Sequence, residues 1–189
     1  GASKPYLRYL STRFDNPRLK GLAMLGLVPL IQEWFSDHRD YVKENVAVLS
    51  NPDIWLAADF KMVPNGTVYF GVEQDEPAVA ETDIPEFMQQ WEKYIYPAKE
   101  QEAWPDMIAP WNEMALRHTS KVANNLGFAC QEAGKNENAL AAYKRAYEIE
   151  PENISALLNI ASLSDKIESD DAERWHRKLE EKIEDIGRE

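Results

Sequence analysis

The segment Lys121–Pro151 combines small residues and helix-ending residues in an order that few folds accommodate. Gly134 suits the left-handed backbone conformation that ends a helix, and Pro151 ends a second helix. Gly127 and Ala139 would lie where these two helices face each other, because the lack of a large side chain lets helices approach closely. The segment is therefore predicted to be a helical hairpin, with the remaining space between its helices filled by larger apolar side chains.

A weaker copy of the same arrangement begins near Ile154. Leu157, Ile160 and Ala161 are at the equivalent positions of this second copy. Its second helix, from about Asp170, matches the first copy poorly but keeps an apolar face. The apolar residues of that helix are Trp175, Leu179, Ile183 and Ile186. Such a helix is typical of the terminal cap of a repeat array.

The hairpin resembles the tetratricopeptide (TPR) repeat, a helix pair of about 34 residues with the pattern W-x2-L-G-x2-Y, A-x3-F and a final proline. In this chain the pattern reads Ala123-x2-Leu126-Gly127-x2-Cys130, then Ala139-x3-Tyr143, Ala146 and Pro151. One repeat matches and the next is degenerate, while residues 110–120 are predicted to extend the first helix backwards. The resemblance implies a binding or packing module and not a catalytic site.

Asn125 and Asn159 occupy the same position of the two copies, 34 residues apart. In the tetratricopeptide family that position often lies on the concave face, where an asparagine can form two hydrogen bonds to an extended peptide. The resemblance thus implies a peptide groove that also uses Lys121, Asn124 and Phe128. Alternatively, the asparagines are solvated or bond neighbouring turns, since so few repeats make only a shallow groove.

The formal net charge of the 189 residues is −12, so most of the surface would repel nucleic-acid phosphate and an anionic membrane. We therefore expect no nucleic-acid partner and no membrane contact, and a peptide or protein segment as the partner. The single cysteine, Cys130, excludes an intrachain disulfide. The longest apolar run, Leu22–Ile31, is too short to cross a bilayer.

Helix patterns dominate the start of the chain. Asn16 and Pro17 are typical of a helix N-terminus. The helix that follows is predicted to have one broad buried face, and Pro29 should kink or divide it. The apolar positions of that face are Leu19, Leu22, Ala23, Leu25, Gly26, Leu30, Ile31, Trp34 and Phe35.

Two β-type runs follow, at Val46–Leu49 and Thr67–Val72. Between them the pattern predicts a short helix at Ile54–Phe60 and a turn at Pro64-Asn65-Gly66. This order predicts a small β-α-β unit with a right-handed crossover, and an antiparallel pair is the alternative.

An acidic linker precedes a capping box that starts at Asp83 and opens a further helix. The buried stripe of that helix is predicted to be Phe87, Trp91, Tyr94 and Ile95. We expect a small α/β subdomain at 1–81, a connecting helix and Pro-rich linker at 82–109, and the helical repeat with its capping helix at 110–189. The fold class is thus α+β, mostly α, with a small two-stranded β element followed by TPR-like helical hairpins.

The segment from about Glu44 to Val72, which includes Val46–Leu49 and Asp59–Gly71, is together with the later repeat similar to one further family. In multi-span membrane glycosyltransferases that resemble protein O-mannosyltransferases, a soluble tail has a strand, a turn like Pro64-Asn65-Gly66, a second strand and then helical repeats. The resemblance implies an extracytoplasmic accessory domain that positions an acceptor polypeptide or stabilises the enzyme. It carries over no catalytic residue, and without it we expect a cytoplasmic protein.

No pattern points to catalysis. His38, His118 and His176 lie far apart and outside any metal-ligand spacing, and Cys130 is interpreted as a buried, inert thiol. We expect no catalytic residue, no metal and no cofactor.

The chain is therefore interpreted as a non-catalytic TPR-like protein-interaction or structural domain of a larger bacterial protein. The alternatives are the accessory domain of a membrane glycosyltransferase, and a small enzyme with a cleft between the two halves near Asp53–Asp75.

Overall fold

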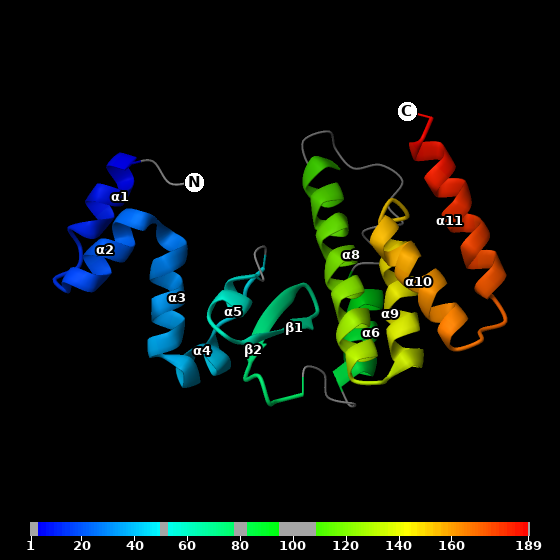
Figure 1. Cartoon of the computed structure of the whole chain (residues 1–189), viewed down its shortest axis with the longest axis horizontal. Helices are drawn as coiled ribbons and strands as arrows, with labels where there is room; N and C mark the ends of the chain where they lie inside the picture. The colour runs from blue at the N-terminus through cyan, green and yellow to red at the C-terminus, as the bar shows by residue number, and fades with distance from the viewer. Residues whose placement is uncertain (1–3, 50–52, 78–82, 95–108, 189) are drawn as a thin grey trace. The chain divides into compact units, whose positions relative to one another are not determined.

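The computed structural model describes residues 4–49, 53–77, 83–94 and 109–188 (Figure 1). The described residues are mostly helical and include a two-stranded antiparallel hairpin, which confirms the predicted fold class. The elements are α1 (Lys4–Ser11), α2 (Pro17–Leu25), α3 (Leu27–Asp37), α4 (Arg39–Asn45), α5 (Asp53–Ala57), β1 (Lys61–Asn65), β2 (Val68–Val72), α6 (Asp83–Tyr94), α8 (Ala109–Glu132), α9 (Asn136–Ile149), α10 (Ile154–Lys166) and α11 (Ala172–Ile186).

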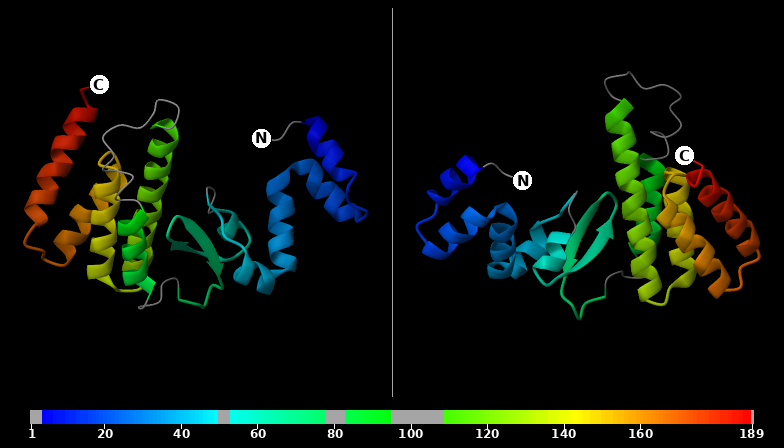
Figure 2. Two further views of the ribbon diagram at one scale, coloured as in Figure 1. Left: turned by 180° about the vertical axis from the view of Figure 1, so that it is seen from behind. Right: turned by 45° about the horizontal axis from the view of Figure 1, so that its top comes forward.

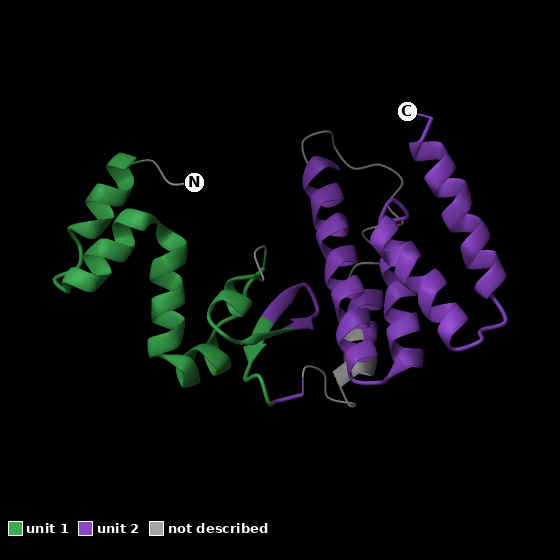
Figure 3. Cartoon of the chain, viewed as in Figure 1, with its two compact units in different colours: residues 1–62, 70–75 green, residues 63–69, 76–189 purple. Residues whose placement is uncertain are grey.

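The chain divides into two compact units, which are coloured separately in Figure 3. The first unit contains Gly1–Met62 and Phe70–Asp75, and the second contains Val63–Tyr69 and Glu76–Glu189. The β-hairpin therefore contributes its base to the first unit and its tip to the second. The predicted division at residues 81 and 109 stays a prediction.

The helix start predicted at Asn16 is confirmed. The side chain of Asn16 accepts a hydrogen bond from the backbone amide of Arg18 at 2.8 Å, and Pro17 is the first residue of α2. The helix is divided as predicted, but at Gly26 and not at Pro29. Gly26 has a φ of 145°, which side chains other than glycine rarely adopt, while Pro29 lies in the first turn of α3, where its missing N–H is not needed.

The prediction of one broad buried face on α2 and α3 is wrong. Ala23 and Phe35 are buried, whereas Leu25 is 75% exposed, and Ile31 and Trp34 are also exposed. Among the described elements, α2 makes extensive contacts only with its sequence neighbours α1 and α3. Helix α3 packs against α5 with only part of its surface, so much of the apolar stripe has nothing to cover it.

The β-α-β prediction is also wrong. Val46–Leu49 forms no strand, and the first strand is β1, directly before the turn. The turn consists of Gly66 and Thr67, so Pro64 belongs to β1 and the two strands form an antiparallel hairpin. Gly66 has a φ of 61°, and a two-residue hairpin turn needs this conformation.

Trp55 of α5 is the centre of the core of the first unit. The centroid of its ring lies 4.7 Å from that of Phe35 and 5.5 Å from that of Phe60. Gly71 of β2 approaches the indole so closely that a Cβ atom there would overlap it. Phe35, Phe60 and Gly71 thus pack together around the indole of Trp55.

Arg39 of α4 packs at the edge of this core. Its guanidinium lies 4.0 Å above the ring of Phe60 and donates to the backbone oxygens of Ala58 and Asp59 at 3.2 Å. It also pairs with Glu73, and this hydrogen-bonded cation holds the pKa of the Glu73 carboxyl below its ordinary value.

In the second unit, α8, α9, α10 and α11 pack as consecutive helix pairs (Figures 1 and 2). The first helix extends back to Ala109, as predicted, and Gly134 follows its end with a φ of 75°. The second helix ends at Ile149, two residues before Pro151. In the terminal helix Trp175 is buried, but Ile183 and Ile186 are exposed, so only part of its predicted apolar face is packed.

Gly127 and Tyr143 form the closest contact between α8 and α9. A Cβ atom on Gly127 would lie 2.5 Å from ring carbons of Tyr143, so only glycine fits beneath this ring. The Tyr143 hydroxyl donates to Gln131 Oε1 at 3.0 Å, and burial raises the pKa of Tyr143 to about 12. The predicted close approach of the two helices is confirmed.

A buried polar junction connects this pair to the next one. Ser120 Oγ of α8 donates to the backbone oxygen of Ala146 in α9 at 2.8 Å. The same Oγ accepts a hydrogen bond from Asn153 Nδ2 at 2.7 Å, and Asn153 Oδ1 caps α10 by accepting from the amide of Ala156. One serine thus helps to set where the third helix begins.

Asp171 anchors the last helix. Its carboxylate accepts hydrogen bonds from Lys144 Nζ at 2.8 Å, from Ser169 Oγ at 2.6 Å and from Trp175 Nε1 at 2.9 Å. These three donors, Lys144 first, hold the pKa of Asp171 well below its ordinary range.

Some sequence predictions fall outside what the structure describes. Trp91 is buried as predicted, but the side chains of Phe87 and Tyr94 are not described, and Ile95 lies outside the described residues. None of the described helices is both long and apolar enough to span a bilayer.

Replacing Gly127 by alanine should lower the free energy of unfolding by about 1–3 kcal/mol, because the added methyl group overpacks the contact with Tyr143. The matched control is Gly21→Ala in α2, where the added Cβ meets nothing within 4 Å, so the better helix propensity of alanine should raise stability by up to about 1 kcal/mol. Chemical denaturation followed by circular dichroism measures both. A Gly127→Ala variant as stable as the parent would contradict the packing assigned here.

Replacing Asp171 by alanine should cost about 1–2 kcal/mol of stability at neutral pH, since three hydrogen-bond donors lose their acceptor. Because the pKa of Asp171 is lowered in the folded state, its contribution is complete above the ordinary value of 3.8 and falls as the pH drops below it. Denaturation curves between pH 7 and pH 3 should therefore show that the difference in free energy of unfolding between the parent and Asp171→Ala becomes smaller as the pH falls. The exposed neighbour variant Asp170→Ala should show no such narrowing.

Candidate functional site

The five residues predicted to bind a peptide lie on α8 and α10, which are the first helices of the two successive pairs. Asn159 Nδ2 of α10 donates to Asn124 Oδ1 of α8 at 3.0 Å, so these two amides join the helices directly. Lys121 and Phe128 are exposed on α8. With Asn125 they follow helical spacing and therefore share one face of that helix.

Asn125 has a partner within the chain. Its Nδ2 donates to the hydroxyl of Tyr69 at 2.9 Å, although the two residues are 56 positions apart. Tyr69, on β2, is almost completely buried, and burial raises the pKa of its phenol while the hydrogen bond from Asn125 opposes that rise. Asn125 is thus held in place by the tip of the β-hairpin.

The hairpin tip makes further contacts with the helices of the second unit. His118 Nε2 lies 2.8 Å from the backbone oxygen of Thr67, and its ring meets that of Tyr69 edge-on. Trp91 Nε1 of α6 donates to the backbone oxygen of Gly66 at 2.9 Å. The chain itself therefore covers part of the α8 face on which the peptide groove was predicted.

The role of Tyr69 was not evident from the sequence. In the structure the burial of β2 alternates, with Tyr69 and Gly71 both buried and their neighbours less so. The sequence of β2 shows no matching alternation of polar and apolar residues, and nothing in the spacing connects Tyr69 with a helix 56 positions away.

A cavity of about 330 Å³ lies next to Lys121, between α8 and the start of α10. Its lining residues are Arg117, Lys121, Glu150, Glu152, Asn153, Ile154 and Ser155. Arg117 is paired with Glu113 and Glu152 with Lys182, so two of the charges at its edge are already neutralised. Two cations and two carboxylates line the cavity, so it suits a polar group such as a peptide group.

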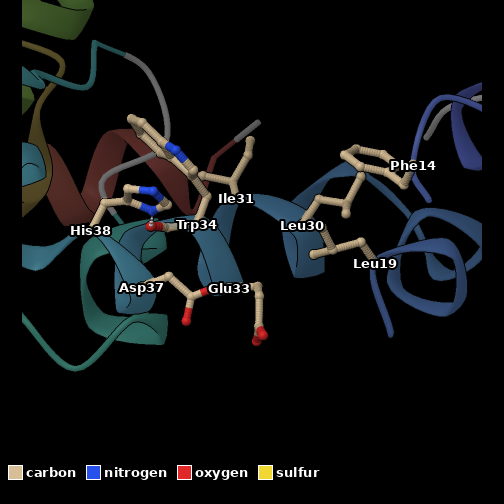
Figure 4. Close-up of a pocket in the computed structure, with 8 residues that line it drawn as sticks. All are labelled: Phe14, Leu19, Leu30, Ile31, Glu33, Trp34, Asp37 and His38. Atoms are coloured by element: carbon tan, nitrogen blue, oxygen red, sulfur yellow. Dashed lines mark hydrogen bonds between the residues drawn. The ribbon is translucent and has the colours of Figure 1, made fainter. Parts of the chain in front are cut away.

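A second cavity, of about 290 Å³, lies within the first unit beside α3 (Figure 4). Its wall is apolar and is formed by Phe14, Leu19, Leu30, Ile31 and Trp34. Three polar side chains also line it, Glu33, Asp37 and His38. Glu33 pairs with Arg18 at 2.8 Å, and His38 Nδ1 bonds the backbone oxygen of Trp34. Two of the three polar side chains, Glu33 and His38, are thus engaged by neighbours, and the rest of the wall is apolar.

The described residues contain no cluster of three or more histidine, cysteine or acidic side chains suited to a metal ion. His118 bonds a backbone oxygen, and His176 pairs with Asp165 at 2.7 Å. Burial raises the pKa of Cys130 to about 11, so this thiol stays protonated at neutral pH, as expected of an inert cysteine.

Comparison with protein-family models, with curated proteins and with solved structures found no match for this chain. Its function must therefore be inferred from geometry and charge.

A double-mutant cycle on Tyr69→Phe and Asn125→Ala should give a coupling energy of about 0.5–1.5 kcal/mol, since each change removes one side of the same partly buried hydrogen bond. Chemical denaturation of the parent, the two single variants and the double variant measures it. Asn159→Ala combined with Tyr69→Phe is the control pair and should be additive. Additive behaviour of the Tyr69–Asn125 pair would mean that Asn125 is free to serve a ligand.

Proposed function

We propose that this chain is a non-catalytic helical-repeat domain of the tetratricopeptide type that holds a peptide segment of a partner protein. The observation that carries the proposal is the face shared by α8 and α10, which the Asn124–Asn159 hydrogen bond aligns. Consecutive helix pairs stack with such faces side by side, and repeat proteins use the resulting surface for binding.

Exposed apolar side chains support this proposal. Phe128 of α8 is 55% exposed and Leu158 of α10 is 46% exposed, whereas the neighbouring Leu126 and Leu157 are buried. A partly exposed aromatic residue provides a large contact area, and such residues are enriched among those that dominate binding energy. We therefore assign apolar side chains of the peptide to this part of the face.

The polar end of the face lies at Lys121. Lys121 is exposed and borders the polar cavity at the start of α10. Arg117 and Lys121 are the two cations that line the cavity, and Arg117 is paired with Glu113, so we assign Lys121 as the group that attracts a peptide carboxylate in a chain of net charge −12. An acidic or C-terminal group of the peptide suits this position.

Asn159 and Asn125 have different roles in this proposal. Asn159 shares its amide with Asn124 and keeps its remaining hydrogen-bonding groups for a peptide backbone. Asn125 donates its hydrogen bond to the hydroxyl of Tyr69 on the β-hairpin, so in this proposal it positions the hairpin at the edge of the groove and does not bind the peptide.

The alternative of an accessory domain of a membrane glycosyltransferase is retained as a second proposal. The antiparallel hairpin carrying Pro64-Asn65-Gly66 precedes the helix pairs in the order that this resemblance implies. The full-length gene product tests it, because several membrane-spanning segments ahead of this region would support the proposal and a product without them would contradict it.

The peptide-binding proposal is tested by screening a peptide array with the full chain and then measuring affinity for the best peptide by calorimetry. Phe128→Ala should weaken binding by about tenfold, as expected for a residue that contributes more than about 1 kcal/mol. Lys121→Glu should weaken it further for acidic peptides. Ile183→Ala and Lys166→Glu, at exposed positions on α11 and at the end of α10, are the matched controls and should leave the affinity unchanged.

The outcome that contradicts the proposal is specific. If no peptide binds, or if the control variants weaken binding as much as Phe128→Ala and Lys121→Glu do, the shared face of α8 and α10 is not a peptide site. Thermal unfolding of each variant separates loss of binding from loss of fold.

A further inference from the structure

The charges of this acidic chain are unevenly distributed. Residues 1–32 contain five of the 21 lysine and arginine residues but only one of the 33 acidic residues. The five basic residues are Lys4, Arg8, Arg13, Arg18 and Lys20, and all are exposed. Glu33 and Asp37 of α3 add two acidic residues, and Glu33 pairs with Arg18 at 2.8 Å. The first three helices and their connections thus carry five basic and three acidic residues, a small positive excess in a strongly negative chain.

The same helices expose an unusual amount of apolar surface. No charged residue occurs between Lys20 and Glu33, and this uncharged run turns a corner at Gly26 between α2 and α3. At the corner Met24, Leu25, Leu27 and Val28 are all exposed, and Leu25 is the most exposed large apolar residue of the described chain. A corner of aliphatic side chains flanked by lysine and arginine is amphipathic in the manner of membrane-surface segments.

The apolar surface continues along one side of α3. Leu27, Ile31 and Trp34 follow helical spacing, and all three are exposed. Figure 4 shows Ile31 and Trp34 on one side of α3 and the carboxylates of Glu33 and Asp37 on the other. The two carboxylates therefore lie on the opposite side of the helix in this view, although they line the same hollow as Ile31 and Trp34.

The first four helices also carry exposed aromatic residues. Trp34 meets Tyr41 edge-on with ring centroids 6.1 Å apart, and both residues are exposed. Tyr6 and Tyr9 are exposed on α1, and the guanidinium of Arg13 lies 6.0 Å from the centre of the Tyr9 ring. Tryptophan and tyrosine are the residues that favour the boundary between lipid tails and water.

We propose that α1, α2 and α3 form a binding site for an anionic lipid surface. The aliphatic corner at Gly26 enters the headgroup region, the tyrosines and Trp34 lie at its boundary, and the basic side chains pair with lipid phosphates and carboxylates. Burial of the exposed aliphatic groups supplies the apolar part of the affinity, and the local cationic field supplies the rest. The site is separate from the proposed peptide face of α8 and α10.

Charge and composition favour lipid over a protein partner. A protein interface has a polar rim whose hydrogen bonds define its register. Between Gly21 and Gln32 the only polar side chain is that of Gln32, so this run offers area but almost no directional contacts. An apolar surface with a diffuse positive charge suits a fluid anionic surface, which needs no fixed partner groups.

The test is co-sedimentation of the full chain with phosphatidylcholine vesicles and with vesicles that also contain phosphatidylserine, at low and high salt. Binding should require phosphatidylserine and should weaken at high salt, because salt screens exposed charges. Leu25→Glu should reduce the partition coefficient at least about tenfold, since an exposed leucine that inserts is replaced by a charge. Leu56→Glu, an exposed leucine on α5, is the matched control and should bind like the parent.

A second pair of variants separates local from total charge. Arg13→Glu with Lys20→Glu should reduce the partition coefficient by more than about fivefold for each residue, because each neutralised cation near an anionic surface costs about that factor and reversal costs more. Lys166→Glu with Arg177→Glu changes the net charge equally on exposed residues of the second unit and should have little effect.

Two results would overturn the proposal. One is absence of binding to phosphatidylserine vesicles at low salt, or equal losses in the variants and their controls. The other is self-association of the parent, measured by analytical ultracentrifugation, that Leu25→Glu abolishes without any vesicle binding, which would show that a second copy covers this surface. Circular dichroism confirms that each variant is folded.

Discussion

The contact between Gly127 and Tyr143 is the constraint on which the helical half of this protein depends. Because the Tyr143 ring lies directly against the backbone of α8, helices α8 and α9 are closer than a larger residue at position 127 would allow. At this distance Ser120 can reach the backbone of α9 and also hold Asn153, which caps α10. The position of α10 then brings Asn159 to Asn124. One small residue therefore influences the geometry of the face that we assign to a peptide.

The β-hairpin tip shows how a short repeat array meets its own packing needs. An array with so few helix pairs leaves apolar surface at its first helix. Tyr69 and the turn after β1 cover part of that surface, and the hydrogen bond from Asn125 orients the tyrosine. The groove is shortened as a result, and the part that stays open lies between Lys121 and the start of α10 and around Phe128.

The parts of the fold that were predictable are those determined by local spacing. The helix pairs, the glycine that ends α8 and the close approach at Gly127 follow from residues within one repeat. The first half was harder, because an apolar stripe indicates a helix but not which element covers it, and here the α2 and α3 stripe is mostly uncovered. Likewise the hydrogen bond between Asn125 and Tyr69 joins residues 56 positions apart, and no local pattern encodes it.

The net charge of the whole chain is a poor guide to the charge that a ligand meets at one surface. A value of −12 argues against anionic partners only if the charges are spread evenly over the surface. Exposed charges are screened beyond about 8–10 Å at physiological ionic strength, so a ligand responds mainly to the charged residues beside it and hardly to those farther away. The basic residues of α1 and α2 therefore set the local charge that a ligand meets there, reduced at Arg18 by its ion pair with Glu33. The same reasoning applies to Lys121. It lines a cavity, so a bound peptide group would lie well within the screening length of its charge, even though the domain as a whole is acidic.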